Sequence, residues 1–163
     1  MISLSDIKII EDTRQKQGKH ENVARFLADK KIAVARRKLD VGDYMIEGNG
    51  SIAIDTKTGL SELCMDFGSE SGRFRREMER AAEIGLKLVF LIEEAGYTKI
   101  ADVEHWKNPN HAGKTLFMSG KELAKRMWRA KVSYGVDFAF CDKKNVGEAL
   151  IAILTQKSEE EDL

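Results

Sequence analysis

One segment constrains the fold of this chain more than any other: residues 39–57, with the sequence LDVGDYMIEGNGSIAIDTK. Within it, residues 44–46 and 51–55 are short runs of the kind that favours β-strands. Residues 47–50 between them read Glu-Gly-Asn-Gly, and Gly and Asn tolerate the positive φ angles of tight hairpin turns. The segment therefore predicts a β-hairpin.

The second strand of this hairpin separates its side chains by chemistry. Side chains alternate along a strand, so Ile52 and Ile54 are expected on one face, and Asp55 and Lys57 together on the other. The hairpin also brings Asp43, at the start of the first strand, close to the end of the second. Two carboxylates and a lysine are thus expected at one end of the hairpin.

This grouping suits a divalent cation. Carboxylates are costly to bury without partners, and Mg²⁺ is commonly held by one or two carboxylates with water and substrate phosphate. Asp43 and Asp55 would hold the ion, together with the backbone carbonyl of Thr56. Lys57 would orient or help deprotonate an attacking water and stabilise charge on a phosphate. The pattern alone fits a surface hairpin with ordinary charges as well as it fits a nuclease.

Several motifs, in the same order along the chain, resemble the nuclease domain of the XPF/Hef group of structure-specific endonucleases. The family pattern is Gly-Asp, a variable gap, and then Glu-Arg-Lys. The similar pieces here are Gly42-Asp43 with Asp55-Thr56-Lys57, the early Asp12-Thr13-Arg14, the helical Gly72-Arg73-Phe74, and Glu93 at the end of an apolar strand.

The resemblance implies a restriction-endonuclease-like fold, an α/β three-layer sandwich in which helices flank a mixed central β-sheet. Strands interleaved with helices along the chain agree with such layers. The resemblance also implies a DNA endonuclease that depends on Mg²⁺ or Mn²⁺. The residues that it marks as catalytic are Asp12, Asp43, Asp55 and Lys57.

The chain departs from the family pattern at several positions. Asp55 and Thr56 stand where the family has Glu and Arg, and Gln15 stands where the early motif continues with Glu. The acid that the family has four residues after the lysine is replaced by Ser61, which leaves Glu62 as a candidate acid one place later. By analogy, these departures indicate a compact member of bacterial or phage type.

The length of 163 residues suits a single domain with a proper core. We expect residues 1–157 to form one nuclease domain and the acidic residues 158–163 to be disordered. The formal net charge is zero, but Lys and Arg outnumber Asp and Glu by seven in residues 14–38 and by six in residues 107–131. This asymmetry favours a basic DNA-facing surface, and solvated helix faces account for it equally well.

Arginines on a predicted helix at residues 71–84 have two possible roles: they contact phosphate, or they pair with neighbouring glutamates such as Glu77. Residues 96–118 lack a regular pattern, and predict either a loop that touches DNA or a plain surface loop. The candidates for nucleic-acid contact are Arg14, Arg73, Arg76 and Lys114.

Hydrophobic periodicity predicts the remaining elements. Strands are expected at residues 7–10, 32–38, 86–92 and 137–140, and helices at 21–30, 60–67, 71–84, 119–133 and 145–156. In the helix at 119–133, Trp128 suits a core or an interface better than a stacked base. This helix also carries a basic stripe, and together with the last helix it is a candidate homodimer face.

The cysteines and the hydropathy of the sequence indicate the cellular compartment. Cys64 and Cys141 are far apart and lack metal-ligand spacing, which indicates buried thiols in a reducing compartment. The sequence has no signal peptide and no apolar run long enough to cross a membrane. We expect a cytoplasmic protein without membrane association.

The expected function is hydrolysis of phosphodiester bonds in branched or junction DNA, such as Holliday junctions, in recombination or repair. Relatives join this domain to a tandem helix–hairpin–helix module, for which these residues leave no room. Branch preference is therefore expected from the domain itself, from residues 96–118 or from a partner.

Two alternatives stay open. One is a catalytically inactive nuclease-fold protein that binds DNA or a partner. The other is an interaction protein built on the same fold, such as a phage-encoded inhibitor. Retention of Asp43, Asp55 and Lys57 together favours activity.

Overall fold

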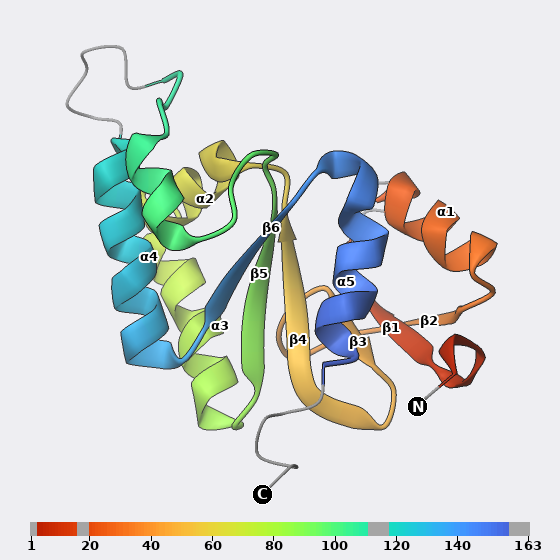
Figure 1. The fold of residues 1–163 in the computed structure, drawn as a ribbon. Coiled ribbons are helices and arrows are strands. Elements are labelled where there is room, and N and C mark those ends of the chain that lie inside the picture. Colours follow the sequence, from red (N-terminus) through yellow and green to blue (C-terminus); the bar gives the residue numbers. More distant parts are fainter. Residues whose placement is uncertain (1–2, 16–19, 111–117, 157–163) are drawn as a thin grey trace, which may run out of the picture.

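The computed structural model describes residues 3–15, 20–110 and 118–156, and they form three layers (Figure 1). The middle layer is a six-stranded sheet with the strand order β2-β1-β3-β4-β5-β6. Its strands are β1 (Lys8–Asp12), β2 (Ala33–Arg37), β3 (Tyr44–Ile46), β4 (Asn49–Lys57), β5 (Lys87–Glu93) and β6 (Asp137–Cys141).

The sheet is mixed, as the sequence predicts. Strands β4, β5 and β6 are parallel, and so are β1 and β2. Strand β3 is antiparallel to both of its neighbours, β1 and β4. Strand β5 lies between two parallel strands and is buried from Leu88 to Ile92, because helices cover both of its faces.

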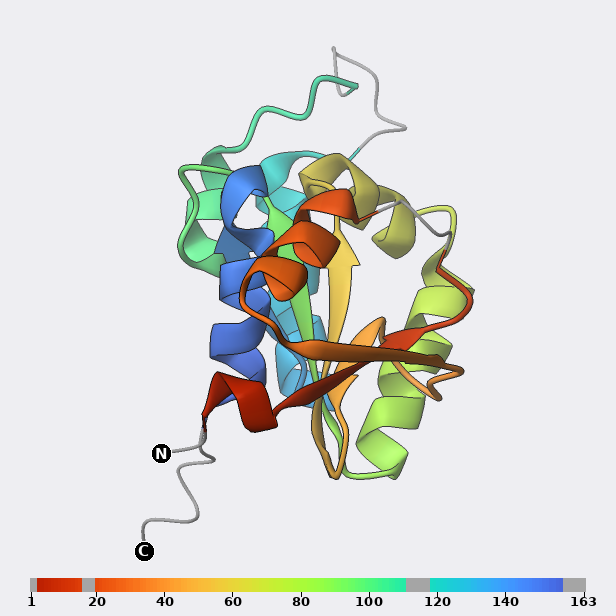
Figure 2. The same ribbon diagram turned by 90° about the vertical axis from the view of Figure 1, so that its right-hand side faces the viewer.

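Helices form the two outer layers. Helices α1 (Glu21–Asp29) and α5 (Val146–Leu154) pack on one face of the sheet. Helices α2 (Leu60–Phe67), α3 (Ser71–Glu83) and α4 (Gly120–Tyr134) pack on the other. Figure 2 shows α2 and α3 on the opposite side of the sheet from α5. This α/β sandwich confirms the predicted fold class.

The hairpin forms as predicted, with a tighter turn. Only Glu47 and Gly48 make the turn, and Asn49 already pairs with Ile46. Gly48 has a φ of +82°, which glycine adopts without strain. The predicted four-residue connection was therefore too long, because Asn49 and Gly50 extend β4.

The side chains of β4 separate between the two cores as expected. Ala53 belongs to the core under α2, α3 and α4, whereas Ile54 belongs to the core under α1 and α5. The alternation of side chains therefore places Asp55 and Lys57 on the same face as Ala53, beneath α2 and α3.

The remaining predicted strands and helices are present, with ends shifted by a few residues. The stretch predicted as irregular contains a 3-10 helix, Ile100–His105, which packs against α4. Trp128 is 48% exposed, which excludes the core, and an interface role for Trp128 stays a prediction. Cys64 and Cys141 are free and only partly buried.

Two predictions fall wholly outside the described residues: Lys114 and the tail 158–163. Helices α4 and α5 cover opposite faces of the sheet, with β6 at the sheet edge. The predicted homodimer face stays a prediction. None of the helices within the described residues is long and apolar enough to span a membrane.

Candidate active site

A cavity of about 690 Å³ opens where the end of β4 meets α2 and α3. Its walls combine carboxylates from the hairpin and both helices with arginines from α3. The predicted site residues that line it are Asp12, Arg14, Asp43, Asp55, Thr56, Lys57, Glu62, Arg73 and Arg76. The structure thus brings together every predicted site residue that it describes.

Backbone hydrogen bonds fix Asp43 between two strands. Its carbonyl accepts a bond from the N–H of Asp12 (2.8 Å), and its own N–H donates to the carbonyl of Ile54 (2.7 Å). The preceding Gly42 has a φ of +77°, and a Cβ there would lie 3.0 Å from both the Ala53 Cβ and the Ile54 carbonyl oxygen. Glycine at this position lets Asp43 approach β4.

The carboxylate of Asp43 is oriented by Thr56. Its Oδ2 accepts one bond from the Thr56 N–H (2.9 Å) and one from the Thr56 hydroxyl (3.0 Å). No described residue donates a hydrogen bond to Oδ1 of Asp43, so this oxygen can take a cation. Thr56 was predicted only as a source of a carbonyl ligand, whereas its side chain also contributes.

Asp55 lies in the crowded centre of the cavity and is only 7% exposed. Its pKa is raised well above the ordinary value, first by burial and then by the charges of Asp43 and Glu77, with Lys57 opposing. Hydrogen bonding with Glu77 raises the pKa of Asp55 further. Glu77 also accepts a bond from the N–H of Gly42 (3.3 Å). Three acidic side chains therefore share a small space.

Lys57 is held between two carboxylates. Its Nζ lies 3.2 Å from Asp55 Oδ1 and 2.7 Å from Asp66 Oδ2, and its side chain is only 8% exposed. The rings of Phe74 and Phe90 also lie under this ammonium, at 5.4 and 5.7 Å. Burial alone would lower the pKa of Lys57, but the two carboxylates outweigh burial and raise its pKa. The side chain is a cation at neutral pH.

Asp12 and Arg14 form hydrogen bonds with the loop that leads into the hairpin. Asp12 accepts bonds from Arg14 Nε (2.8 Å) and from the N–H of Leu39 (3.0 Å), one on each oxygen. Arg14 also donates to the Leu39 carbonyl (2.5 Å). Both oxygens of Asp12 are thus used within the protein, although the residue borders the cavity.

The glutamate flagged as a candidate acid has a local partner. Glu62 accepts bonds from the N–H (2.6 Å) and the hydroxyl (2.8 Å) of Thr58, just before α2 begins. These bonds hold one oxygen of Glu62 against Thr58, the residue that precedes the N-cap Gly59. Asp66, one turn further along α2, reaches Lys57 instead.

Arg73 and Arg76 line the cavity from α3 and are both exposed. Their neighbour Arg75 pairs with Glu79 (3.6 Å) and is not among the lining residues. Arg80 also lines the cavity and donates to the Asp40 carbonyl (3.2 Å).

Comparison with sequence profiles of protein families matches residues 11–154 to the ERCC4 domain. The chain belongs to the ERCC4 domain family. This confirms the resemblance to XPF-type nuclease domains that the hairpin motifs indicate. A comparison with curated proteins gives no match.

Solved structures agree with the ERCC4 assignment. The chain is similar to XPF from Aeropyrum pernix, with a TM-score of 0.65 and 18% identity over 90% of this chain and 63% of that one. It is similar to the same protein in complex with DNA, with a TM-score of 0.66 and 18% identity over 91% and 63%. The ERCC4 domain described here thus spans less than two thirds of those chains.

Three residues of this ERCC4 domain were missed as site residues: Asp66, Glu77 and His20. Glu77 follows Phe74 by three positions, and Asp66 follows Leu63 by three, so both border the buried stripe of their helix. That spacing marks an acid beside a buried face and could have flagged both. No local pattern in the sequence marks His20.

The donor set fits a hard divalent cation. In the described residues no three His, Cys, Asp or Glu side chains gather at metal-ligand spacing. Mg²⁺ nevertheless needs only one or two protein carboxylates, with water and phosphate as further ligands. Asp43 and Asp55 supply these, and the pKa of Asp55 is raised first by burial and then by the charge of Asp43.

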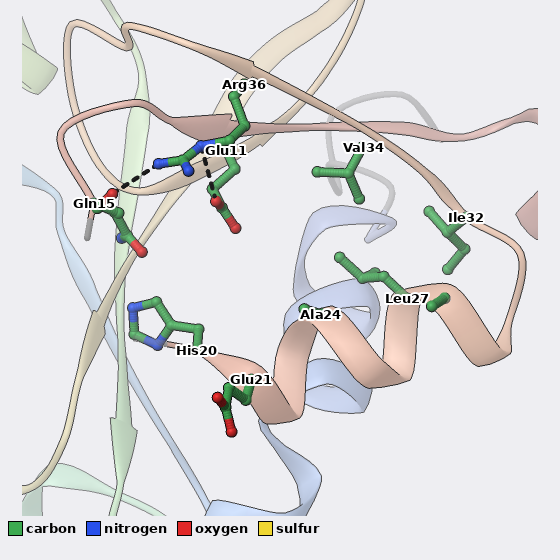
Figure 3. Close-up of a pocket in the computed structure, with 10 residues that line it drawn as sticks. Glu11, Gln15, His20, Glu21, Ala24, Leu27, Ile32, Val34 and Arg36 are labelled. Atoms are coloured by element: carbon green, nitrogen blue, oxygen red, sulfur yellow. Dashed lines mark hydrogen bonds and ion pairs between the residues drawn. The ribbon is translucent and has the colours of Figure 1, made fainter. Parts of the chain in front are cut away.

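A second cavity of about 390 Å³ lies on the other side of the hairpin, between α1 and the strands β1 and β2 (Figure 3). Its wall is largely apolar, with Leu27 and Ile32 among the lining residues. Its acid Glu11 pairs with Arg36 at 3.4 Å, and Arg36 also donates to the Gln15 carbonyl (2.7 Å). The lining residues include two glutamates, Glu11 and Glu21, and one arginine, so this wall carries far fewer carboxylates than the first cavity.

Proposed function

We propose that this ERCC4 domain is a metal-dependent DNA endonuclease that hydrolyses phosphodiester bonds in branched or junction DNA, as in recombination and repair. The observation that carries the proposal is the closeness of Asp43 and Glu77 to Asp55, with Lys57 paired to Asp55, in a cavity bordered by arginines. Membership of the ERCC4 family and the match to a DNA-bound XPF structure support it.

In this proposal Asp43 and Asp55 hold Mg²⁺ or Mn²⁺, with the Thr56 carbonyl as a further ligand. When bound, the cation polarises the phosphodiester and favours formation of a nucleophile from water. Glu77 adds to the raised pKa of Asp55, and a bound cation would offset the charges of these neighbouring carboxylates.

Lys57 acts as a fixed positive charge. Two carboxylates keep it protonated, so orientation of the attacking water and stabilisation of the phosphate are better supported than removal of a proton from that water. Asp66 holds the ammonium in place from α2.

In this proposal Arg73 and Arg76 contact phosphates of the DNA backbone. Both are exposed at the border of the cavity, where their guanidinium groups can meet the DNA backbone. Such contacts position the nucleic acid without reading its sequence. Asp12 and Arg14 assist by holding the loop before Asp43.

The test is cleavage of labelled four-way junction, flap and linear duplex DNA with Mg²⁺, Mn²⁺ or EDTA, for the wild type, Asp55→Asn and Glu11→Gln. We expect metal-dependent cutting that prefers branched DNA. Loss of an outer partner of a metal ligand costs about 10–100-fold, so loss of the Asp55 charge should cost more than about 100-fold. Glu11→Gln, in the second cavity, should cut like the wild type.

Asp55→Asn should keep its DNA affinity or gain some, because one repulsive charge is gone. Retained cutting by Asp55→Asn would contradict the assigned site. Binding without cutting by the wild type would favour the alternative function, an inactive nuclease fold that binds DNA or a partner.

A further inference from the structure

We propose that His20 and the hydroxyl of Thr56 are positioning residues for Asp43, joined in one hydrogen-bond chain that starts at the head of α1. The inference rests on the proposed function, because Asp43 matters here as a metal ligand. Its elements are on three separate parts of the fold: α1, β4 and the start of the hairpin.

The distances define the chain of bonds. The His20 Nε2 lies 3.2 Å from the Thr56 Oγ1, and Oγ1 lies 3.0 Å from the Asp43 Oδ2. A threonine hydroxyl has one proton, and here that proton goes to the carboxylate. Oγ1 must therefore accept from His20, so His20 carries a proton on Nε2.

His20 is well placed for this role. Figure 3 shows its ring extending from the start of α1 on the side of the loop that carries Gln15. The ring also makes an edge contact with Tyr44, at a centroid distance of 6.0 Å and an angle of 66°. Tyr44 is fully buried and directly follows Asp43, so the histidine is held against the start of the hairpin.

The chain of bonds has a chemical consequence. Oδ2 of Asp43 receives two hydrogen bonds from Thr56, which fixes the carboxylate plane and directs Oδ1 to the cation. The Thr56 N–H belongs to the backbone and is always present, whereas the hydroxyl bond depends on the rotamer of Thr56. His20 selects that rotamer by donating to Oγ1. Partners of this kind typically change metal affinity or activity by about 10–100-fold when they are removed.

The test is the affinity for Mn²⁺ alone, measured by calorimetry on full-length variants, with the melting temperature recorded for each. Thr56→Val keeps the shape but lacks the hydroxyl, and His20→Leu lacks the donor. Both should bind Mn²⁺ about 10–100-fold more weakly than the wild type. The matched control is Thr98→Val, whose hydroxyl bonds to Asp102 away from the cavity, and it should bind like the wild type.

Conservative variants separate positioning from packing. Thr56→Ser restores the hydroxyl, and His20→Gln places an amide N–H near the position of Nε2, so both should recover most of the lost affinity. The double variant Thr56→Val with His20→Leu should lose little more than Thr56→Val alone, because both changes break the same chain.

The outcomes distinguish this inference from the function on which it rests. Wild-type affinity in both Thr56→Val and His20→Leu overturns the positioning role alone. Losses that the conservative variants do not recover also overturn it, because they would reflect packing. A wild type that binds no Mn²⁺ overturns the proposed function, and this inference with it.

Discussion

The two cavities on either side of the hairpin differ in the number of carboxylates that line them. The cavity under α1 is lined by Glu11, Glu21 and Arg36, and Glu11 pairs with Arg36 at 3.4 Å. In the cavity under α3, Asp55 has a raised pKa because burial and neighbouring carboxylates outweigh Lys57. A folded chain tolerates such an imbalance only if a proton, or a ligand with positive charge, compensates it.

The comparison teaches that charge imbalance, rather than the presence of a cavity, marks the candidate site. Strongly perturbed carboxyl groups in a cleft are common at functional sites. His20 connects the two regions, since it lines the first cavity and bonds to Thr56 in the second.

The largest expected effect is a loss of unfolding free energy when the paired cation of each cavity is removed. Lys57→Met leaves Asp55 and Asp66 without their buried partner, and loss of one member of a buried ion pair costs about 3–5 kcal/mol of unfolding free energy. Arg36→Met breaks the more exposed pair with Glu11 and should cost about 1 kcal/mol. Urea denaturation of both variants measures the difference, and equal losses would contradict the contrast between the cavities.

The second effect is on pH dependence in the absence of metal. The folded-state pKa of Asp55 lies above its unfolded value of about 3.9, so the folded state binds the proton more tightly. The resulting stability is fully present below the unfolded pKa and is lost as pH rises through the folded one. Each unit of separation corresponds to about 1.4 kcal/mol.

Thermal denaturation in EDTA at several pH values measures this fall. Asp55→Asn should flatten it, and Glu11→Gln should leave it unchanged. If the stability of Asp55→Asn still falls as steeply with rising pH, the pH dependence belongs to another titratable group.

How much of this was predictable from sequence depends on whether the interaction is local. The alternation in β4 places Asp55 and Lys57 on one face, because a period of two is a property of the strand itself. The acids on the helices were not predicted, since Asp66 and Glu77 reach the site only after α2 and α3 pack over β4. The role of His20 could not be predicted either, because it depends on how the start of α1 lies against the hairpin.

For some site residues, the residue type was known but its contacts could not be predicted. Thr56 stands where the family pattern has Arg, and the sequence predicted only its backbone carbonyl as a ligand. The structure shows that its hydroxyl bonds to Asp43. Asp12 was predicted beside the site and does border it, but its oxygens hold Arg14 and the Leu39 N–H.

The smallest expected effect concerns DNA affinity. Arg73 borders the acidic cavity, whereas Arg75 on the same helix pairs with Glu79. If Arg73 contacts one phosphate, Arg73→Ala should weaken binding and reduce the slope of log K against log salt by about 0.9. Arg75→Ala is the matched control and should leave the slope unchanged. Fluorescence anisotropy with a junction DNA measures both, and equal slopes would return Arg73 to a structural role.

The most direct test of the central claim is the thermal shift produced by Mn²⁺ in the wild type, Asp55→Asn and Glu11→Gln. At 100 times the dissociation constant, a ligand of the folded state adds about 2.7 kcal/mol, which corresponds to roughly 5–10 °C for a protein of this size. We predict this shift for the wild type and Glu11→Gln, and almost none for Asp55→Asn. No shift in the wild type, or an equal shift in Asp55→Asn, would contradict a cation site built on the acidic cavity.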